Sequence, residues 1–99
     1  MRIELSELDE TIRRILEWGC DRAFIECRAV EGEIGQQLHR ISVWRAHQGK
    51  FKLECLMEFL ELDCNQKDAI EKIEARLLSM YKDKNGERDP LGVLDSRQA

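Results

Sequence analysis

Two apolar stripes between residues 51 and 81 constrain the fold more than any other feature of this 99-residue chain. In each stripe the apolar residues recur every three or four positions, which is the spacing that places side chains on one face of a helix. The link between the stripes, residues 63–65, is too short to hold another element. We therefore predict a helical hairpin made of helices 51–62 and 65–82. The stripes are Leu53, Leu56, Met57 and Leu60, and then Ile70, Ile73, Leu77 and Tyr81.

The size of the chain indicates a single domain. Chains of about 100 residues bury only about two-thirds of their unfolded surface, so a partner or a second copy often completes the core. We predict one compact domain over residues 1–86, followed by a polar tail over 87–99. The residue types that a pleated sheet favours are scarce, with three Val, one Thr and one Tyr in the whole chain. The composition therefore favours helices over strands.

A first helix is predicted over residues 6–18. Ser6 is a good N-cap, and acidic residues crowd the first turn, where the helix dipole favours them. Gly19, directly after the helix, suits the left-handed conformation that often ends one. The apolar stripe of this helix comprises Leu5, Leu8, Ile12, Ile15 and Leu16.

Residues 21–47 permit two interpretations. If the segment is helical, most of its apolar residues fall within one broad face, with acidic residues early and basic residues late, as the helix dipole favours. Gly32 and Gly35 would each cost about 1 kcal/mol relative to Ala inside a helix, so we expect a break there. This interpretation gives helices 21–31 and 34–47.

The alternative interpretation is a sheet. Alternating apolar residues in 23–29 and 51–59, with a hairpin turn at Gln48-Gly49, would give an α+β fold of helix, three-stranded antiparallel sheet and helix. The middle segment follows neither strand parity, however, and a strand would turn Glu61 to the apolar face. We therefore expect an all-α fold, a small bundle of about four helices. The predicted helices are 6–18, 21–31, 34–47 and the 51–62/65–82 hairpin.

The charges of the chain argue against several classes of partner. The net charge is −4, and charged residues of both signs, 36% of the chain, are mixed along it. Direct binding of nucleic acid is not expected, because such proteins gain affinity from clustered Lys and Arg. No apolar run approaches the roughly 20 residues of a membrane span, and the N-terminus lacks the apolar core of a signal peptide. We expect a cytoplasmic protein without membrane contact.

No catalytic, cofactor or metal site is predicted. On a helix, His39 and His47 would lie about 12 Å apart at 1.5 Å per residue, too far to share an ion. The chain lacks glycine-rich phosphate loops, Cys-x-x-Cys pairs and the His-Glu-x-x-His motif. We expect a protein that is not an enzyme, with a thiol- or metal-dependent enzyme as the competing hypothesis, and reduced cysteines that pack as small apolar residues. The cysteines are Cys20, Cys27, Cys55 and Cys64.

The favoured function is binding of another protein. The chain carries more large apolar and aromatic groups than a small core needs, and surplus groups of this kind usually lie in an interface. We predict a module such as an adaptor, an assembly chaperone or an inhibitor of a larger complex, self-associating as a homodimer. The predicted partner-binding residues are Trp18, Trp44, Phe51, Phe59, Tyr81, Glu54, Glu58 and Glu61.

A second hypothesis gives the acidic residues the main role. An acidic inhibitor can occupy the basic groove of a nucleic-acid-binding complex by presenting carboxylates in place of phosphates. Its affinity for a basic partner would fall steeply with salt. The carboxylates available for such mimicry on the predicted helices are Glu54, Glu58, Glu61, Glu71 and Glu74.

Overall fold

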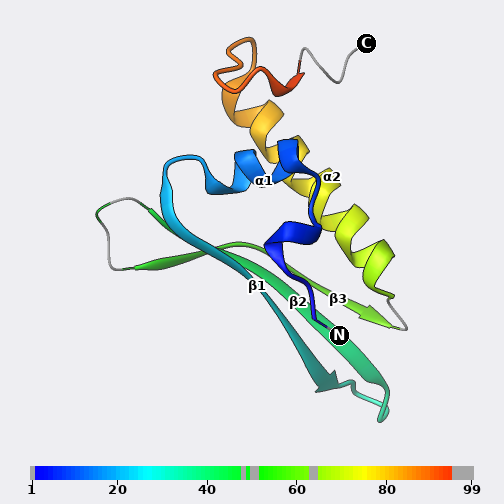
Figure 1. Ribbon diagram of the computed structural model, residues 1–99. Helices are drawn as coiled ribbons and strands as arrows, with labels where there is room; N and C mark the ends of the chain where they lie inside the picture. The colour runs from blue at the N-terminus through cyan, green and yellow to red at the C-terminus, as the bar shows by residue number, and fades with distance from the viewer. Residues whose placement is uncertain (1, 48, 50–51, 63–64, 95–99) are drawn as a thin grey trace.

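The chain forms a sheet in its middle and helices before and after it. The computed structural model describes residues 2–47, 49, 52–62 and 65–94. Within these residues the elements are the 3-10 helix η1 (Leu5–Glu7), α1 (Glu10–Glu17), β1 (Cys20–Glu31), β2 (Gln37–His47), β3 (Leu53–Leu62) and α2 (Gln66–Asn85). The strands are antiparallel in the order β1-β2-β3, so β2 is central. Figure 1 shows α1 and α2 on the same side of the sheet.

The all-α prediction is wrong, and the α+β alternative is confirmed. The residues predicted as helices 21–31, 34–47 and 51–62 form β1, β2 and β3. The cause lies in the central strand, which is apolar on both faces: Ile41 is buried against the helices, while Trp44 lies on the opposite face. Such a strand lacks the alternation that identifies a half-buried strand, so its apolar pattern also fits a helix.

Gly32 and Gly35, which were expected to break a helix, lie in the turn that joins β1 to β2. Gly35 has a φ of +74°, a left-handed conformation that glycine adopts without strain. Its N–H donates to the Gly32 carbonyl at 3.2 Å, and the Gly32 N–H donates to the Gln36 carbonyl at 2.5 Å. The chain therefore reverses direction here instead of continuing as a kinked helix.

The first helix is present but shorter than the predicted 6–18. It begins after Asp9, whose carboxylate accepts a hydrogen bond from the Thr11 N–H at 2.9 Å and so caps α1. Ser6, the predicted cap, lies instead within η1. Gly19 adopts the expected left-handed conformation, with a φ of +72°.

The last helix is confirmed and extends beyond the predicted 65–82. The Asn65 side chain accepts a hydrogen bond from the Asp68 N–H at 2.9 Å, which caps the start of α2. Asp63, the other candidate cap, lies outside the described residues. The helix ends at Gly86. No helix in the described part of the chain is long and apolar enough to cross a membrane.

One layer of side chains between the helices and the sheet forms the core. The buried residues of α2 are spaced by four, and they pack with the apolar face of α1 and with the helix-facing side of β2 and β3. Full burial of a large aliphatic side chain contributes roughly 1.5–3 kcal/mol before the entropy cost of ordering it. The core comprises Ile3, Leu8, Ile12, Ile15, Leu16, Ile41, Val43, Met57, Phe59, Ala69, Ile73, Leu77, Tyr81 and Val93.

The third strand contains a bulge at Leu56. Val43 of β2 pairs with Met57, but the next residue, Trp44, pairs with Cys55, so Leu56 has no counterpart on β2. Leu56 packs against the core beside Met57. The regular alternation that the sheet alternative assumed for this strand is therefore interrupted, because Cys55 lies on the face opposite to Met57.

Glu61 shows how a strand accommodates a charge on its helix-facing side. It is paired with His39 in the register and faces the helical layer. Its carboxylate forms an ion pair with Lys72 of α2. The helix therefore supplies a cation where the strand pattern alone would leave a carboxylate among apolar groups.

The segment after α2 folds back onto the helix. Asp89 accepts hydrogen bonds from the Tyr81 hydroxyl at 2.7 Å and from the N–H groups of Val93 and Leu94 at 3.0 and 2.8 Å. Burial, together with the bond to Asp89, raises the pKa of Tyr81. Val93 is almost completely buried. Part of the predicted tail 87–99 thus packs on the domain, while its end lies outside the described residues.

Asp89→Ala is expected to destabilise the domain by about 1–3 kcal/mol, because the buried Tyr81 hydroxyl and the Val93 N–H lose an acceptor. Urea unfolding followed by tryptophan fluorescence measures the change. The control is Glu87→Ala at an exposed position, which should change the free energy of unfolding by less than about 0.5 kcal/mol. Equal effects of the two variants would contradict a stabilising role for the Asp89 turn.

Candidate functional site

The sheet has one face that no helix covers within the described residues, and we call it the open face. Leu60 and Leu62 on this face are each 50% exposed, and Leu53 is 41% exposed. Large apolar groups exposed on one face are a reason to consider that face as an interaction surface. The open face comprises Arg22, Phe24, Glu26, Arg28 and Val30 of β1, Leu38, Arg40, Ser42, Trp44 and Ala46 of β2, and Leu53, Cys55, Glu58, Leu60 and Leu62 of β3.

Side chains on the open face form rows that run across the strands. In one apolar row, Phe24 and Trp44 stack with ring centroids 6.4 Å apart and planes 11° apart. A second apolar row, toward the other end of the strands, consists of Val30, Leu38 and Leu62. We call these the aromatic row and the aliphatic row.

Two charged rows lie between the apolar rows. The acidic row has Glu26 and Glu58 on either side of Ser42, and the basic row has Arg28 beside Arg40. The guanidinium of Arg28 lies 3.5 Å from the Glu26 carboxylate, and that of Arg40 lies 3.8 Å from the Glu58 carboxylate. These side chains are more than a third exposed, so each pair contributes at most about 1 kcal/mol to the fold. A partner can therefore reach both charged rows.

A pocket of about 600 Å³ lies on the helical side, between α1, α2 and the end of the β2–β3 hairpin. We call it the α2 pocket. Its apolar wall includes Trp18, whose ring meets that of Tyr81 edge-on with centroids 6.4 Å apart. Leu56 also lines the pocket, because the bulge keeps it on the helical side of β3.

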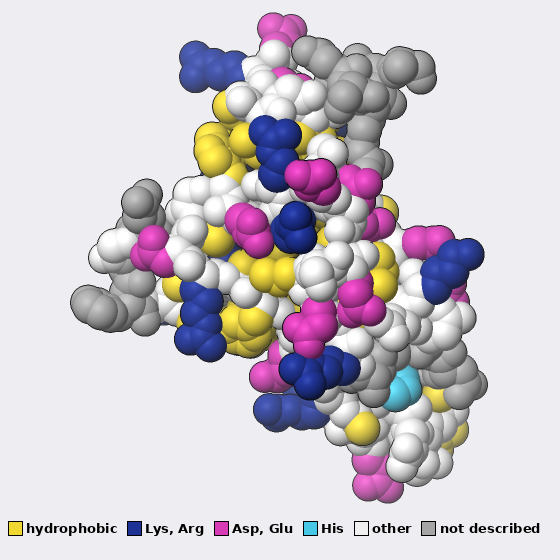
Figure 2. Space-filling model, viewed as in Figure 1, with side chains coloured by type: hydrophobic (Ala, Val, Ile, Leu, Met, Phe, Trp, Pro, Cys, Tyr) yellow, Lys and Arg dark blue, Asp and Glu magenta, His cyan; other side chains and the backbone are white. Residues whose placement is uncertain are grey.

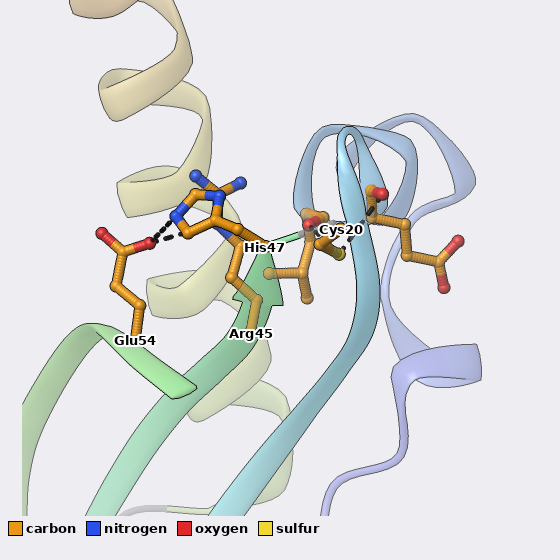
Figure 3. Close-up of polar contacts among 6 residues, drawn as sticks. Cys20, Arg45, His47 and Glu54 are labelled. Atoms are coloured by element: carbon orange, nitrogen blue, oxygen red, sulfur yellow. Dashed lines mark hydrogen bonds and ion pairs between the residues drawn. The ribbon is translucent and has the colours of Figure 1, made fainter. Parts of the chain in front are cut away.

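Arg45 and His47 line the polar end of the α2 pocket, and Glu54 lies beside them on β3. In Figure 3 the side chains of Glu54 and His47 point toward each other. Their hydrogen bond lowers the pKa of Glu54, and the charge of Arg45 lowers it further. The Arg45 side chain is only 15% exposed, and its Nε is buried without a hydrogen-bond partner among the described residues.

The structure distributes the predicted aromatic contact residues over three places. Trp18 and Tyr81 meet at the α2 pocket, with Trp18 exposed and Tyr81 buried. Trp44 lies on the open face. Phe59 is buried in the core, where Lys72 and Arg76 lie over its ring, and Phe51 lies outside the described residues. These aromatic groups therefore do not form a single contact face.

The predicted acidic contact residues are also separated. Glu58 lies on the open face with Arg40, whereas Glu54 and Glu61 lie on the helical side of the sheet, where they pair with His47 and Lys72. The narrow arc expected from a helix does not form. Each of these glutamates instead has a basic side chain within ion-pair distance.

The described cysteines are unpaired thiols. Burial raises the pKa of Cys20 and of Cys27, so the reactive thiolate is disfavoured at both positions. Cys55 is exposed, and Cys64 lies outside the described residues. Within the described part of the chain, no group of three or more His, Cys, Asp and Glu residues could hold a metal ion.

The prediction omits several residues of the candidate sites. Phe24 stacks on Trp44 because the hairpin register pairs the two positions, and the sheet alternative did not specify this register. Arg45 is a basic residue among the largely apolar positions that follow Ile41. A charged residue in such a stretch indicates a buried polar contact, so this signal was present in the sequence. Leu56 could not have been placed in the α2 pocket, since a bulge leaves no clear mark in this sequence.

Native Cys20 and Cys27 are expected to react more slowly with iodoacetamide, at about pH 8, than the same residues in the unfolded chain. Burial both raises the pKa of each thiol and limits access to it. Peptide mass spectrometry after timed labelling gives the rate at each cysteine, and labelling in urea is the reference. A native rate as fast as the rate in urea would contradict this prediction and revive the hypothesis of a thiol enzyme.

Comparison with known proteins gives no match: no protein-family model, no curated protein and no solved structure is similar enough to this chain to be matched with it.

Proposed function

We propose that this chain is a non-enzymatic protein-binding module that pairs face to face with a second copy of itself through the open face. The observation that carries the proposal is the order of the rows along the strands, which runs aromatic, acidic, basic and aliphatic. This order is complementary to its own reverse, because the acidic row then faces the basic row and the aromatic row faces the aliphatic row. Self-complementarity of this kind is what an isologous dimer interface requires.

A two-fold axis produces this pairing when it runs parallel to the sheet, perpendicular to the strands, and passes between the acidic and basic rows. The rotation reverses the strand direction in the second copy, so Glu26 lies opposite Arg28 of the second copy, and Arg28 lies opposite its Glu26. The aromatic row, Phe24 and Trp44, then packs on the aliphatic row of the second copy. Two sheets packed in this way would lie about 10 Å apart, as in a β-sandwich.

The area of the open face is of the order that a dimer needs. Three strands about 4.8 Å apart and about ten residues long cover roughly 500 Å² of sheet, and the accessible surface of the side chains exceeds this projected area. Specific interfaces commonly bury about 800 Å² of accessible surface on each partner. We therefore expect a dimer whose population rises with protein concentration.

A cytoplasmic location is part of the proposal. Its support is the state of Cys20, Cys27 and Cys55, which are unpaired in the structure. Unpaired thiols are typical of proteins in reducing compartments.

Charge reversal tests the proposed pairing. Glu26→Arg would place arginines opposite each other at two symmetric contacts, and Arg28→Glu would do the same with glutamates, so each variant should dimerise at least about tenfold more weakly than the wild type. An equimolar mixture of the two variants should recover a dimer, because every contact in the mixed pair again joins opposite charges. Light-scattering mass at several protein concentrations measures these equilibria.

The matched control is Glu71→Arg, which makes the same charge change at an exposed position on α2 and should leave the dimer intact. Circular dichroism of each variant verifies that the fold is retained. A wild-type chain that stays monomeric at high concentration contradicts the proposal. A variant mixture that stays monomeric while the wild type pairs contradicts the proposed register.

A second candidate function is the acidic mimic of nucleic acid. It is supported by the net charge of −4 and by a seam between η1, α1 and α2 where carboxylates gather. There the Asp9 N–H donates to the Glu74 carboxylate at 2.6 Å, and the Gln66 amide donates to the Glu7 carboxylate. Figure 2, however, shows acidic and basic side chains interspersed over the visible face. Binding of polylysine that weakens steeply with added salt and with Glu74→Gln would favour this candidate.

A further inference from the structure

The α2 pocket is independent of the open face. Its lining comes from α1, α2, the helical side of β2 and the bulge of β3, and it includes no residue of the open face. Its volume of about 600 Å³ lies within the range of roughly 300–1,000 Å³ that is typical of small-molecule sites. The pocket is therefore a ligand site to be considered apart from self-association.

Aromatic and aliphatic side chains form most of the wall of the α2 pocket, and Asp83, Lys84 and Asn85 of α2 add polar groups to it. Trp18 and Met80, which both line it, are 43% and 40% exposed. Leu56, Leu77 and Tyr81 provide more deeply placed apolar surface. Walls of this composition suit a flat or extended apolar body, which would cover side chains that water now contacts.

Arg45 gives the pocket one buried cationic group. Its Nε lacks a hydrogen-bond partner among the described residues, and the Glu54 carboxylate, at 3.7 Å, is beyond hydrogen-bond distance. Glu54 is instead held by His47 (Figure 3). A buried N–H without an acceptor is costly, and a carboxylate is the group whose two oxygens match the parallel N–H groups of a guanidinium.

We propose that the α2 pocket binds a small aromatic or aliphatic carboxylic acid, with the apolar body between Trp18, Leu77 and Met80 and the carboxylate on the guanidinium of Arg45. The carboxylate reaches the guanidinium from the pocket that Arg45 lines, next to the ion pair of Arg45 with Glu54. Glu54 competes for the same guanidinium, so it weakens binding and favours ligands with one negative charge over those with several.

The probe is 2-naphthoate, and 2-naphthamide is its neutral counterpart of the same shape. Titration calorimetry gives the two affinities, and the acid should bind more tightly than the amide. In nitrogen-15-labelled protein, the indole N–H resonance of Trp18 should shift on titration. The resonance of Trp44, on the open face, should stay in place.

Variants of the polar end separate the role of Arg45 from that of its surroundings. Arg45→Met should weaken binding of 2-naphthoate by about tenfold or more and leave the amide unchanged, since only the acid uses the charge. Glu54→Gln should strengthen binding of the acid, because the competing carboxylate is removed. The control is Arg88→Met, which removes an exposed arginine that lies outside both the pocket lining and the open face, and it should bind both probes as the wild type does.

Several results would overturn the proposal. They are equal affinities for the acid and the amide, no binding at millimolar probe, a shift of the Trp44 resonance alone, or an Arg45→Met variant that binds the acid as the wild type does. Where Arg45→Met fails to fold, Glu54→Gln decides the matter, because unchanged or weaker binding by that variant contradicts competition for Arg45.

Discussion

Ile41 and Val43 of the central strand are completely buried in the same cluster as Leu16 of α1 and Ile73 of α2, and the rest of the structure depends on this contact. The apolar side chains of the strand must be buried away from water, and only the flanking helices can bury them. Within the described residues, the helices cover one side of the sheet. The other side keeps a mixture of apolar and charged groups, and the proposed pairing uses that side.

The fold could be predicted only in part from the sequence. The last helix was recognisable because its apolar residues recur at helical spacing and Asn65 caps it, and both signals are local. The strands were misjudged because the deciding facts are not local. The central strand carries apolar groups on both faces although the helices cover only one of them. Glu61 is acceptable in a strand only because Lys72 approaches from α2.

The candidate sites, like the fold, could be predicted only where the signal is local in the sequence. Trp18 was named because the chain carries more large aromatic groups than a small core needs. It lines the α2 pocket, and its contact with a partner stays a prediction. The grouping of the predicted residues failed, because it assumed helical geometry for residues that lie in strands. The stacking of Phe24 on Trp44 and the position of Arg45 on the helical side both depend on the register of the hairpin. The turns and the pattern of buried residues together specify that register.

The bulge at Leu56 has a consequence for the length of the chain. Without Leu56, Met57 and Cys55 would be adjacent, and each could keep its present partner on β2, so the residues on both sides would stay on their own faces. Loss of this one position would therefore give a regular strand and remove only a piece of the pocket wall. Loss of a residue far from the bulge would exchange the inner and outer faces of the positions beyond it. Related chains could differ in length at this position and keep the same fold.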